Sequence, residues 1–316
     1  MAVYTEVSDG ELEAFLGEYD IGEAESFKGI AEGVENTNYV LATSRGRYMV
    51  TLYEKRVEPR DLPFFLGLMD HLAGRGIDCP RPIHGRDGNA LRQLAGRPAA
   101  ITTFLQGMWP RRMTVRHCAQ VGEALAALHL AGRDFALKRP NALSVAGWRP
   151  LYDGCRGHID RGLDAELAAE IDLFEKRWPT DLPAGVIHAD LFNDNVFFLH
   201  DKLSGIIDFY FACNDFLAYD VAICVNAWCF ESDNSFNATK ARALLQAYDR
   251  VRPLNDDERR TLPLLARGSA LRFLLTRLYD WTHTPADALV KRKDPNEYLV
   301  KLRFHRGAAS LADYGL

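Results

Sequence analysis

Apolar residues recur with two different periods along the chain, and the change of period divides it into two regions. Up to about residue 105, apolar and polar residues alternate over short stretches, which is typical of strands. The expected strands cover residues 26–30, 38–43, 47–53, 91–94 and 99–104. Helical spacing predicts helices over residues 9–19 and 63–73 in the same region. Together these elements predict a small antiparallel sheet with one packed helix.

Beyond residue 105 the apolar positions follow the helical period. The expected helices cover residues 115–130, 163–178, 237–251 and 262–281. Between them, residues 186–211 form a strand-like segment that contains several aspartates. The short link at residues 105–107 is the expected hinge. The pattern therefore predicts an α+β protein with an N-terminal lobe over residues 1–105 and a helical C-terminal lobe over residues 106–316.

Length and composition narrow the class of protein. The chain has 316 residues, of which 47% are hydrophobic, enough for a large core. It contains no apolar run of the roughly 20 residues that a membrane span needs, and its N-terminus lacks the features of a signal peptide. The six cysteines are scattered without metal-ligand spacing, which favours reduced, buried thiols. We therefore expect a cytoplasmic protein that has no membrane partner.

The net charge of −5 argues against a nucleic-acid partner, and its location is informative. Residues 188–230 contain six aspartates and one lysine, so the whole net charge falls within this otherwise apolar segment. Burying carboxylates costs free energy unless cations or hydrogen-bond donors compensate them. We therefore interpret the segment as a divalent-cation site.

The same segment contains the most informative motif of the chain. His188, Asp190 and Asn195 have the spacing H-x-D-x-x-x-x-N, and a second apolar stretch ends at Asp208. Further elements are residues 214–222 and a helix pattern that ends in Leu128-His129. Taken together in their chain order, beginning with the helix that ends at His129, the four elements resemble the aminoglycoside-phosphotransferase and choline-kinase-like branch of the protein-kinase-like fold. The resemblance covers residues 27–281.

This resemblance implies a bilobal phosphotransferase that uses ATP and Mg²⁺, with the nucleotide in the N-terminal lobe and catalysis in the C-terminal lobe. Asp190 would be the catalytic base that accepts the proton of the attacking hydroxyl. Asn195 and Asp208 would supply oxygen ligands to the metal. His188 is expected to hold the catalytic loop rather than to bind metal.

At the nucleotide end, residues 29–39 resemble the family's glycine-containing phosphate loop. The resemblance implies that Gly29, Gly33, Asn36 and Asn38 contact the phosphates. Thr103 and Leu105 would lie on the strand that contacts adenine. The chain departs from the kinase pattern at Thr51, which occupies the position where a lysine is expected. Lys55 is a conceivable substitute on the same strand.

Four stretches resemble one subfamily, the bacterial homoserine kinases of this kinase-like type: residues 32–41, 51–56, 188–192 and 207–216. That subfamily has a Thr-Leu-Phe/Tyr-Glu strand where others have lysine, so Thr51 becomes a feature of the group. The resemblance implies ATP-dependent phosphorylation of the side-chain hydroxyl of L-homoserine, a step toward threonine.

A small zwitterionic acceptor needs a cation for its carboxylate and an acidic group for its ammonium. Arg272 or Arg277 could supply the cation, and Asn193, Asp194 and Trp228 could complete the pocket, with Asn226 nearby. Other acceptors stay open, namely choline or ethanolamine, methylthioribose and aminoglycosides. Tyr210, Trp228 and Trp281 could form an aromatic cage for choline. The rival classes are a nucleotide-binding pseudokinase and a metal-dependent phosphohydrolase.

Overall fold

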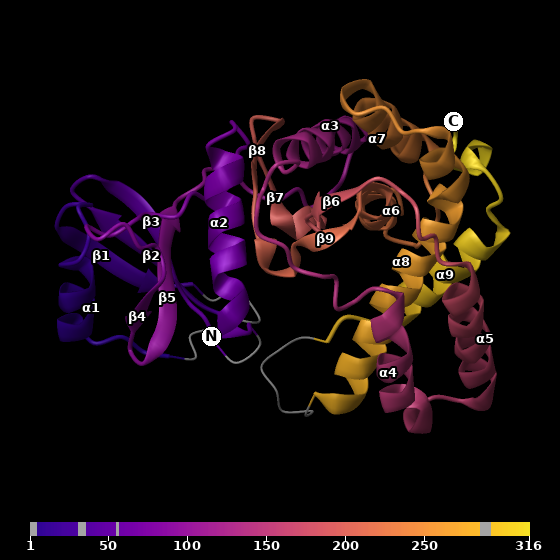
Figure 1. Ribbon diagram of the computed structural model, residues 1–316, viewed down its shortest axis with the longest axis horizontal. Coiled ribbons are helices and arrows are strands. Elements are labelled where there is room, and N and C mark those ends of the chain that lie inside the picture. Colours follow the sequence, from indigo (N-terminus) through magenta and orange to yellow (C-terminus); the bar gives the residue numbers. More distant parts are fainter. Residues whose placement is uncertain (1–4, 31–35, 55–56, 285–291) are drawn as a thin grey trace. The chain divides into compact units, whose positions relative to one another are not determined.

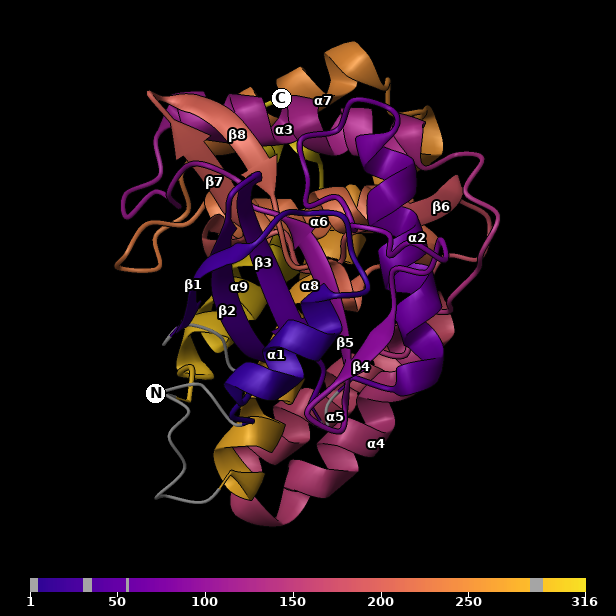
Figure 2. The ribbon, with the colours of Figure 1, turned by 90° about the vertical axis from the view of Figure 1, so that its left-hand side faces the viewer.

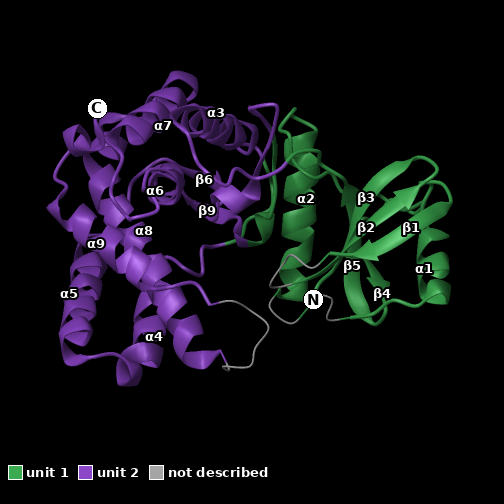
Figure 3. Cartoon of the chain, turned by 180° about the vertical axis from the view of Figure 1, so that it is seen from behind, with its two compact units in different colours: residues 1–107, 135–139, 204–210 green, residues 108–134, 140–203, 211–316 purple. Residues whose placement is uncertain are grey.

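The chain folds into two compact units (Figure 3). The first unit comprises residues 1–107 with two later segments, 135–139 and 204–210, and the second comprises the rest of the chain from residue 108 onward. The computed structural model describes most of the chain, in four stretches: residues 5–30, 36–54, 57–284 and 292–316. The functions predicted for residues 1–105 and 106–316 stay predictions.

The first unit is built on a five-stranded antiparallel sheet with the strand order β1-β2-β3-β5-β4 (Figure 1). Its strands are β1 (Ala24–Gly29), β2 (Thr37–Thr43), β3 (Gly46–Leu52), β4 (Arg92–Leu94) and β5 (Arg97–Thr103). On β2 every second residue is buried, so one face of this strand packs against the core. Thr51 lies on β3, between Asn38 of β2 and Ala100 of β5.

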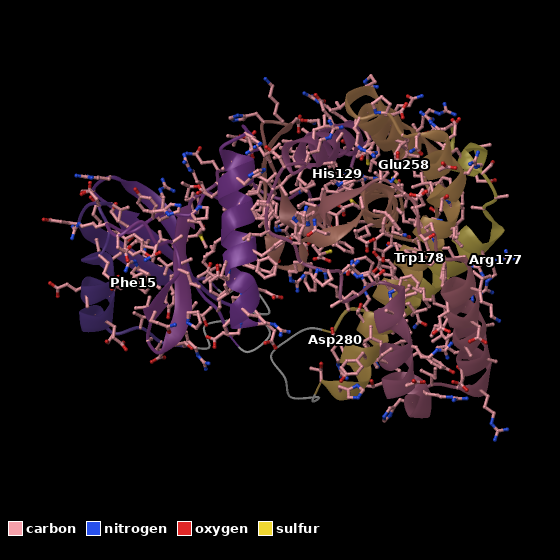
Figure 4. All side chains as sticks on the ribbon, in the orientation of Figure 1. Phe15, His129, Arg177, Trp178, Glu258 and Asp280 are labelled. Atoms are coloured by element: carbon pink, nitrogen blue, oxygen red, sulfur yellow. The ribbon has the colours of Figure 1, made fainter. Side chains whose placement is uncertain are left out.

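Two helices accompany the sheet. α1 (Asp9–Leu16) begins at a capping box formed by Ser8 and Glu11, and it lies in front of the sheet in Figure 2. Phe15 (labelled in Figure 4) packs from α1 into the core that the strands form. α2 (Leu62–Ala73) is the helix expected from the sequence and buries seven of its residues.

The second unit is mainly helical. Its helices are α3 (Val115–Ala131), α4 (Val145–Cys155), α5 (Arg161–Arg177), α6 (Leu217–Trp228), α7 (Ala238–Val251), α8 (Asp256–His283) and α9 (Asn296–Gly307). All residues of α6 are buried, and α3, α7 and α8 pack against it (Figure 1). Two short two-stranded sheets complete the fold: β6 (Ala184–Ile187) pairs antiparallel with β9 (Cys213–Phe216), and β7 (Val196–Leu199) pairs with β8 (Lys202–Ile206), whose residues from 204 onward belong to the first unit.

The predicted α+β class is confirmed, and all the expected strands and helices are present, with ends that differ by a few residues. α4, α6 and α9 were not expected. α6 is apolar on every side and therefore has no helical period, and Pro150 interrupts the pattern of α4. All six cysteines are free and buried, as predicted. No helix in the described part of the chain is long and apolar enough to cross a membrane.

The close packing of α3 on α7 depends on a glycine and yields a stability prediction. A Cβ atom on Gly122 would lie 2.1 Å from the Leu244 carbonyl oxygen of α7. We expect Gly122→Ala to lower the free energy of unfolding by about 1–3 kcal/mol, because backbone atoms must move apart. Urea unfolding measures the loss. Gly157→Ala is the control, since no heavy atom lies within 4 Å of its added Cβ, and equal losses would refute the packing argument.

Candidate active site

A strained turn follows β6 and carries the motif. β6 pairs with β9 as far as Ile187, and the chain then turns through His188 and Ala189 to Asp190. Ala189 has a φ of 64°, a left-handed conformation that costs a residue with a Cβ of the order of 1–3 kcal/mol. Such a conformation persists only where surrounding contacts fix it. The turn at Ala189 therefore depends on neighbouring groups that hold it in place.

The main support is the carboxylate of Asp220, which is fully buried in the first turn of α6. It accepts the backbone N–H groups of His188 at 2.7 Å and Ala189 at 2.9 Å. Nε2 of His129 (labelled in Figure 4) lies 3.2 Å from the same carboxylate and donates to it. Burial raises the pKa of Asp220, but interactions with His129 and His188 outweigh that effect and leave the pKa lowered. An ionised carboxylate thus fixes the turn.

Two residues that the sequence analysis placed in the substrate pocket lie beneath this turn instead. Arg272 is 2% exposed and donates from Nη1 to the Ala189 carbonyl at 2.5 Å. Trp228 is fully buried and donates its indole N–H to the Leu191 carbonyl at 2.8 Å. Asn226 is also fully buried, and its amide donates to the Ala266 carbonyl. Arg272 and Trp228 therefore support the loop from the core side, whereas Asn226 links α6 to α8.

Asp190 and Asn195 lie together at the end of the turn. The Asn195 side-chain amide donates to the Asp190 backbone carbonyl at 2.8 Å and to its carboxylate Oδ2 at 3.3 Å. Within the described residues, the Asn195 Oδ1 has no hydrogen-bond partner, so this oxygen remains available as a ligand. The structure therefore brings two of the three predicted catalytic and metal-binding residues into direct contact.

The third residue, Asp208, belongs to the first unit. It follows β8 with a φ of 64° and precedes a 3₁₀ turn, Phe209–Phe211. Burial raises the pKa of Tyr210 in this turn to about 12, and its hydroxyl interacts with those of Tyr53 and Thr51. Because Asp190 and Asn195 belong to the second unit, the convergence of all three side chains stays a prediction.

The predicted nucleotide residues also belong to the first unit. Thr51, 7% exposed, donates to the Asn38 side chain at 2.8 Å, so its hydroxyl links β3 to β2 where a lysine was expected. Asn36 accepts from the Glu54 backbone N–H at 3.3 Å. The remaining positions are as follows: Gly29 ends β1, Thr103 accepts from the Arg81 backbone N–H, and Leu105 packs against Gly205. Gly33 and Lys55 lie outside the described residues.

Among the aspartates of the acidic segment, some are buried beside hydrogen-bond donors and others are exposed to solvent. Asp220 and Asp215 are met by hydrogen-bond donors, the latter by the Asn141 amide and the Phe216 N–H, both at 2.7 Å. Asp201 is exposed, and the Asp194 side chain is 50% exposed. In the stretches that the structure describes, no three His, Cys, Asp or Glu side chains cluster as metal ligands. Donors rather than a cation therefore offset the buried charge at Asp220.

A cavity of about 600 Å³ opens in the second unit directly beyond the catalytic loop. Phe192, Asn193 and Asp194 line it, so its wall begins two residues after Asp190. Six cationic side chains line it as well: Arg111, Arg112, Lys240, Arg277, Lys293 and Lys301. Three acidic side chains oppose them: Asp194, Glu231 and Glu297. The excess of cations makes the cavity suited to an anionic group.

Sequence reasoning did not find the contribution of α9 to this cavity, because Glu297 and Lys301 lie beyond the region with recognisable motifs. For Asp220 the sequence favours loop ordering or helix capping over metal binding, and the structure confirms that its carboxylate orders the catalytic turn. A signal for Asp220 was present, since it is the only charged residue in the apolar stretch 216–230. A lone acid in such a stretch indicates a buried carboxylate with specific donors.

Comparison with known proteins connects this geometry to a family. Residues 26–254 match the phosphotransferase enzyme family. Over its whole length the chain is 64% identical to a homoserine kinase of Paramagnetospirillum magneticum, also matched over its full length. It is 65% identical to a homoserine kinase of Bradyrhizobium diazoefficiens, of which the match covers 98%.

Solved structures agree with this fold. An amicoumacin kinase superimposes with a TM-score of 0.69 at 14% identity, covering 95% of this chain and 92% of that one. An aminopropanol kinase gives 0.68 at 18% identity, covering 97% of both chains. A choline kinase from Cryptosporidium parvum gives 0.67 at 16% identity, covering 93% and 94%. The predicted protein-kinase-like fold is therefore confirmed, and the chain belongs to the phosphotransferase enzyme family and, within it, to the homoserine kinases.

Proposed function

We propose that this protein transfers the γ-phosphoryl group of ATP to the side-chain hydroxyl of L-homoserine, a reaction that leads toward threonine. The observation that carries the proposal is the Asp190–Asn195 pair on a fixed turn, in a chain that matches homoserine kinases along its whole length. The pseudokinase and phosphohydrolase alternatives gain no comparable support.

Asp190 acts as the base in this reaction. The acceptor oxygen forms a bond to the γ-phosphorus, the bond between that phosphorus and the β–γ bridging oxygen breaks, and ADP leaves. The proton of the acceptor hydroxyl passes to the Asp190 carboxylate. Phosphoryl transfer depends mainly on positioning, so a base on a turn fixed by Asp220 and Arg272 suits it.

The residues present fit a magnesium ion. Asn195 offers Oδ1, a neutral oxygen, because its amide nitrogen is engaged by Asp190. Asn195 and Asp208 would hold the ion, consistent with the preference of Mg²⁺ for few protein ligands beside phosphate and water oxygens. When bound, it would neutralise the negative charge on the phosphates.

We assign nucleotide binding to the first unit. Gly29, Gly33, Asn36, Asn38 and Thr51 are proposed to surround the phosphates. Thr103 and Leu105 are proposed to contact adenine. The cytoplasmic location expected from the sequence also stays a prediction.

The acceptor is proposed to occupy the cavity beyond the catalytic loop, with Asn193 and Asp194 in its wall. Asp194 could receive the acceptor ammonium group. The cationic excess of the cavity disfavours choline and the polycationic aminoglycosides, which would need acidic or aromatic walls. A carboxylate-bearing acceptor is therefore preferred over the alternatives.

A coupled ADP-release assay tests the proposal, with L-homoserine, choline, ethanolamine, methylthioribose and kanamycin as acceptors. We expect turnover with L-homoserine, loss of turnover when magnesium is chelated, and a phosphomonoester product detected by phosphorus NMR. Faster turnover with another acceptor would redirect the assignment to that acceptor. Absence of ADP release with every acceptor would favour the pseudokinase.

A further inference from the structure

Three charged side chains form one wall of the cavity and have no part in the proton transfer. Arg277 of α8 donates from Nη1 to Glu297 Oε2 at 2.6 Å and to the Asp294 carbonyl at 3.0 Å. Lys301 of α9 donates to Glu297 Oε1 at 2.6 Å and to the Asn226 carbonyl at 3.0 Å. Glu297 thus accepts from one cation on each oxygen. We call Arg277, Glu297 and Lys301 the Arg277 cluster.

This cluster has an excess of one positive charge next to the cavity. Burial raises the pKa of Glu297, but Lys301 and Arg277 outweigh it, so the pKa is lowered and the carboxylate remains ionised. Arginine contributes a planar cationic guanidinium to such a cluster. The Arg277 and Lys301 side chains are only 9% and 4% exposed. Because burial lowers the local dielectric constant, a charge at this position attracts an anion more strongly than the charge of a surface arginine does.

Only one nitrogen of the Arg277 guanidinium makes hydrogen bonds to the described residues. Its contacts with Glu297 and Asp294 both use Nη1. Among the described residues neither Nε nor Nη2 has a hydrogen-bond partner, although the side chain is part of the cavity wall. Two N–H groups of one guanidinium form a fork that matches the two oxygens of a carboxylate.

Tyr298 connects the cluster to the catalytic base. Its buried ring packs under both cations, with the Arg277 Cζ and the Lys301 Nζ each 4.4 Å from the ring centroid. Burial raises the pKa of Tyr298 well above its usual value, and the charge of Asp190 contributes in the same direction. The Phe192 ring, two residues after Asp190, lies 6.5 Å from the Tyr298 ring. The cluster and the base therefore border one compact region.

We propose that Arg277, oriented by Glu297 and Lys301, binds the α-carboxylate of the acceptor and makes the enzyme reject the same amino alcohol without a carboxylate. This inference rests on the proposed function, because it names the group by which that acceptor is recognised. The two N–H groups of Arg277 bind the carboxylate at one end of the acceptor. The hydroxyl at the other end of the acceptor lies against Asp190. An acceptor without the carboxylate leaves a buried cationic fork unpaired.

The test compares L-homoserine with 3-aminopropan-1-ol, which is homoserine without its carboxylate, on wild type, Arg277→Gln and Arg277→Lys. Kinetics give kcat and KM, and calorimetry gives Kd for each ligand. Truncating one partner of a buried charge pair strongly weakens binding. We therefore expect Arg277→Gln to raise Kd and KM for L-homoserine by about 100-fold. Binding of 3-aminopropan-1-ol should stay within about threefold of wild type, since that ligand has no group for the fork. Arg277→Lys should recover only part of the loss.

Arg303→Gln is the matched control. Arg303 also lies on α9, but it pairs with Glu166 and its side chain is 55% exposed. This variant should keep wild-type constants for both ligands, and thermal unfolding shows whether each variant is folded.

The outcomes separate the two proposals. Unchanged Kd and KM for L-homoserine in Arg277→Gln, or an equal loss for both ligands, would overturn the role of Arg277. Absence of homoserine turnover in the wild-type enzyme would instead refute the proposed function. Calorimetry would still decide in that case whether Arg277 binds the amino acid.

Discussion

Replacing Asp190 with asparagine is expected to lower kcat for L-homoserine by about 10²–10⁴-fold, the range that general-base catalysis contributes. Asparagine keeps the shape of the side chain and an oxygen that can accept from the Asn195 amide, now 3.3 Å from Asp190 Oδ2. It cannot accept the hydroxyl proton. We therefore expect the defect in kcat, with little change in ATP affinity measured by calorimetry.

The control for Asp190 is Asp201→Asn, which removes one carboxylate from the same acidic segment. Asp201 is exposed, and its backbone carbonyl rather than its side chain accepts from Gln120. This variant should retain wild-type kcat and ATP affinity. If Asp190→Asn turned over L-homoserine at nearly the wild-type rate, the base would have to be another residue.

The sequence predicted the sheet of the first unit well because local pattern determines it. Alternation on β2 places Tyr39, Leu41 and Thr43 on the buried face, and this period is visible without any tertiary contact. α6 was not visible in the same way. The surrounding elements bury α6 on all sides, so its apolar residues follow neither the helical period nor the alternation of a strand.

For the site, the sequence identified the residues of the motif but not the orientations of their neighbours. Asp190 and Asn195 are five residues apart, and the loop between them brings them into contact. Arg272 was assigned to the substrate because a cation suits a carboxylate, and Trp228 because it lies near the catalytic segments in sequence. The fold instead directs both to carbonyls of the catalytic loop, 83 and 37 residues away in sequence. Contacts of that separation depend on helix packing, which no local spacing encodes.

The electrostatics of the acidic segment could also be predicted only in part from the sequence. Its charge predicted a cation, since buried carboxylates need compensation. At Asp220 the compensation comes from two backbone N–H groups and His129, which is 91 residues away in sequence. The requirement for compensation could be derived from composition, whereas the identity of the compensating groups could not.

Asp220→Asn should therefore destabilise the protein and impair catalysis together. The amide offers one accepting oxygen where the carboxylate has two, so a buried N–H of His188 or Ala189 faces an NH₂ group. Leaving a buried donor unpaired and weakening the hydrogen bond that His129 makes to residue 220 should lower the free energy of unfolding by about 3 kcal/mol. The released Ala189 turn no longer fixes Asp190, so kcat should also fall. Urea unfolding and steady-state kinetics at neutral pH measure the two effects.

The pH dependence distinguishes this explanation from a loss of packing. Because the pKa of Asp220 is lowered in the folded protein, its ionised form contributes stability that is fully present above the unfolded pKa of about 3.9. That contribution is lost as pH falls through the lower, folded pKa. The stability difference between wild type and Asp220→Asn should thus be constant near neutral pH and shrink in acid. A difference that is independent of pH, or as small as that of Asp201→Asn, would assign Asp220 a packing role only, and the catalytic turn would have to be fixed by Arg272 and Trp228.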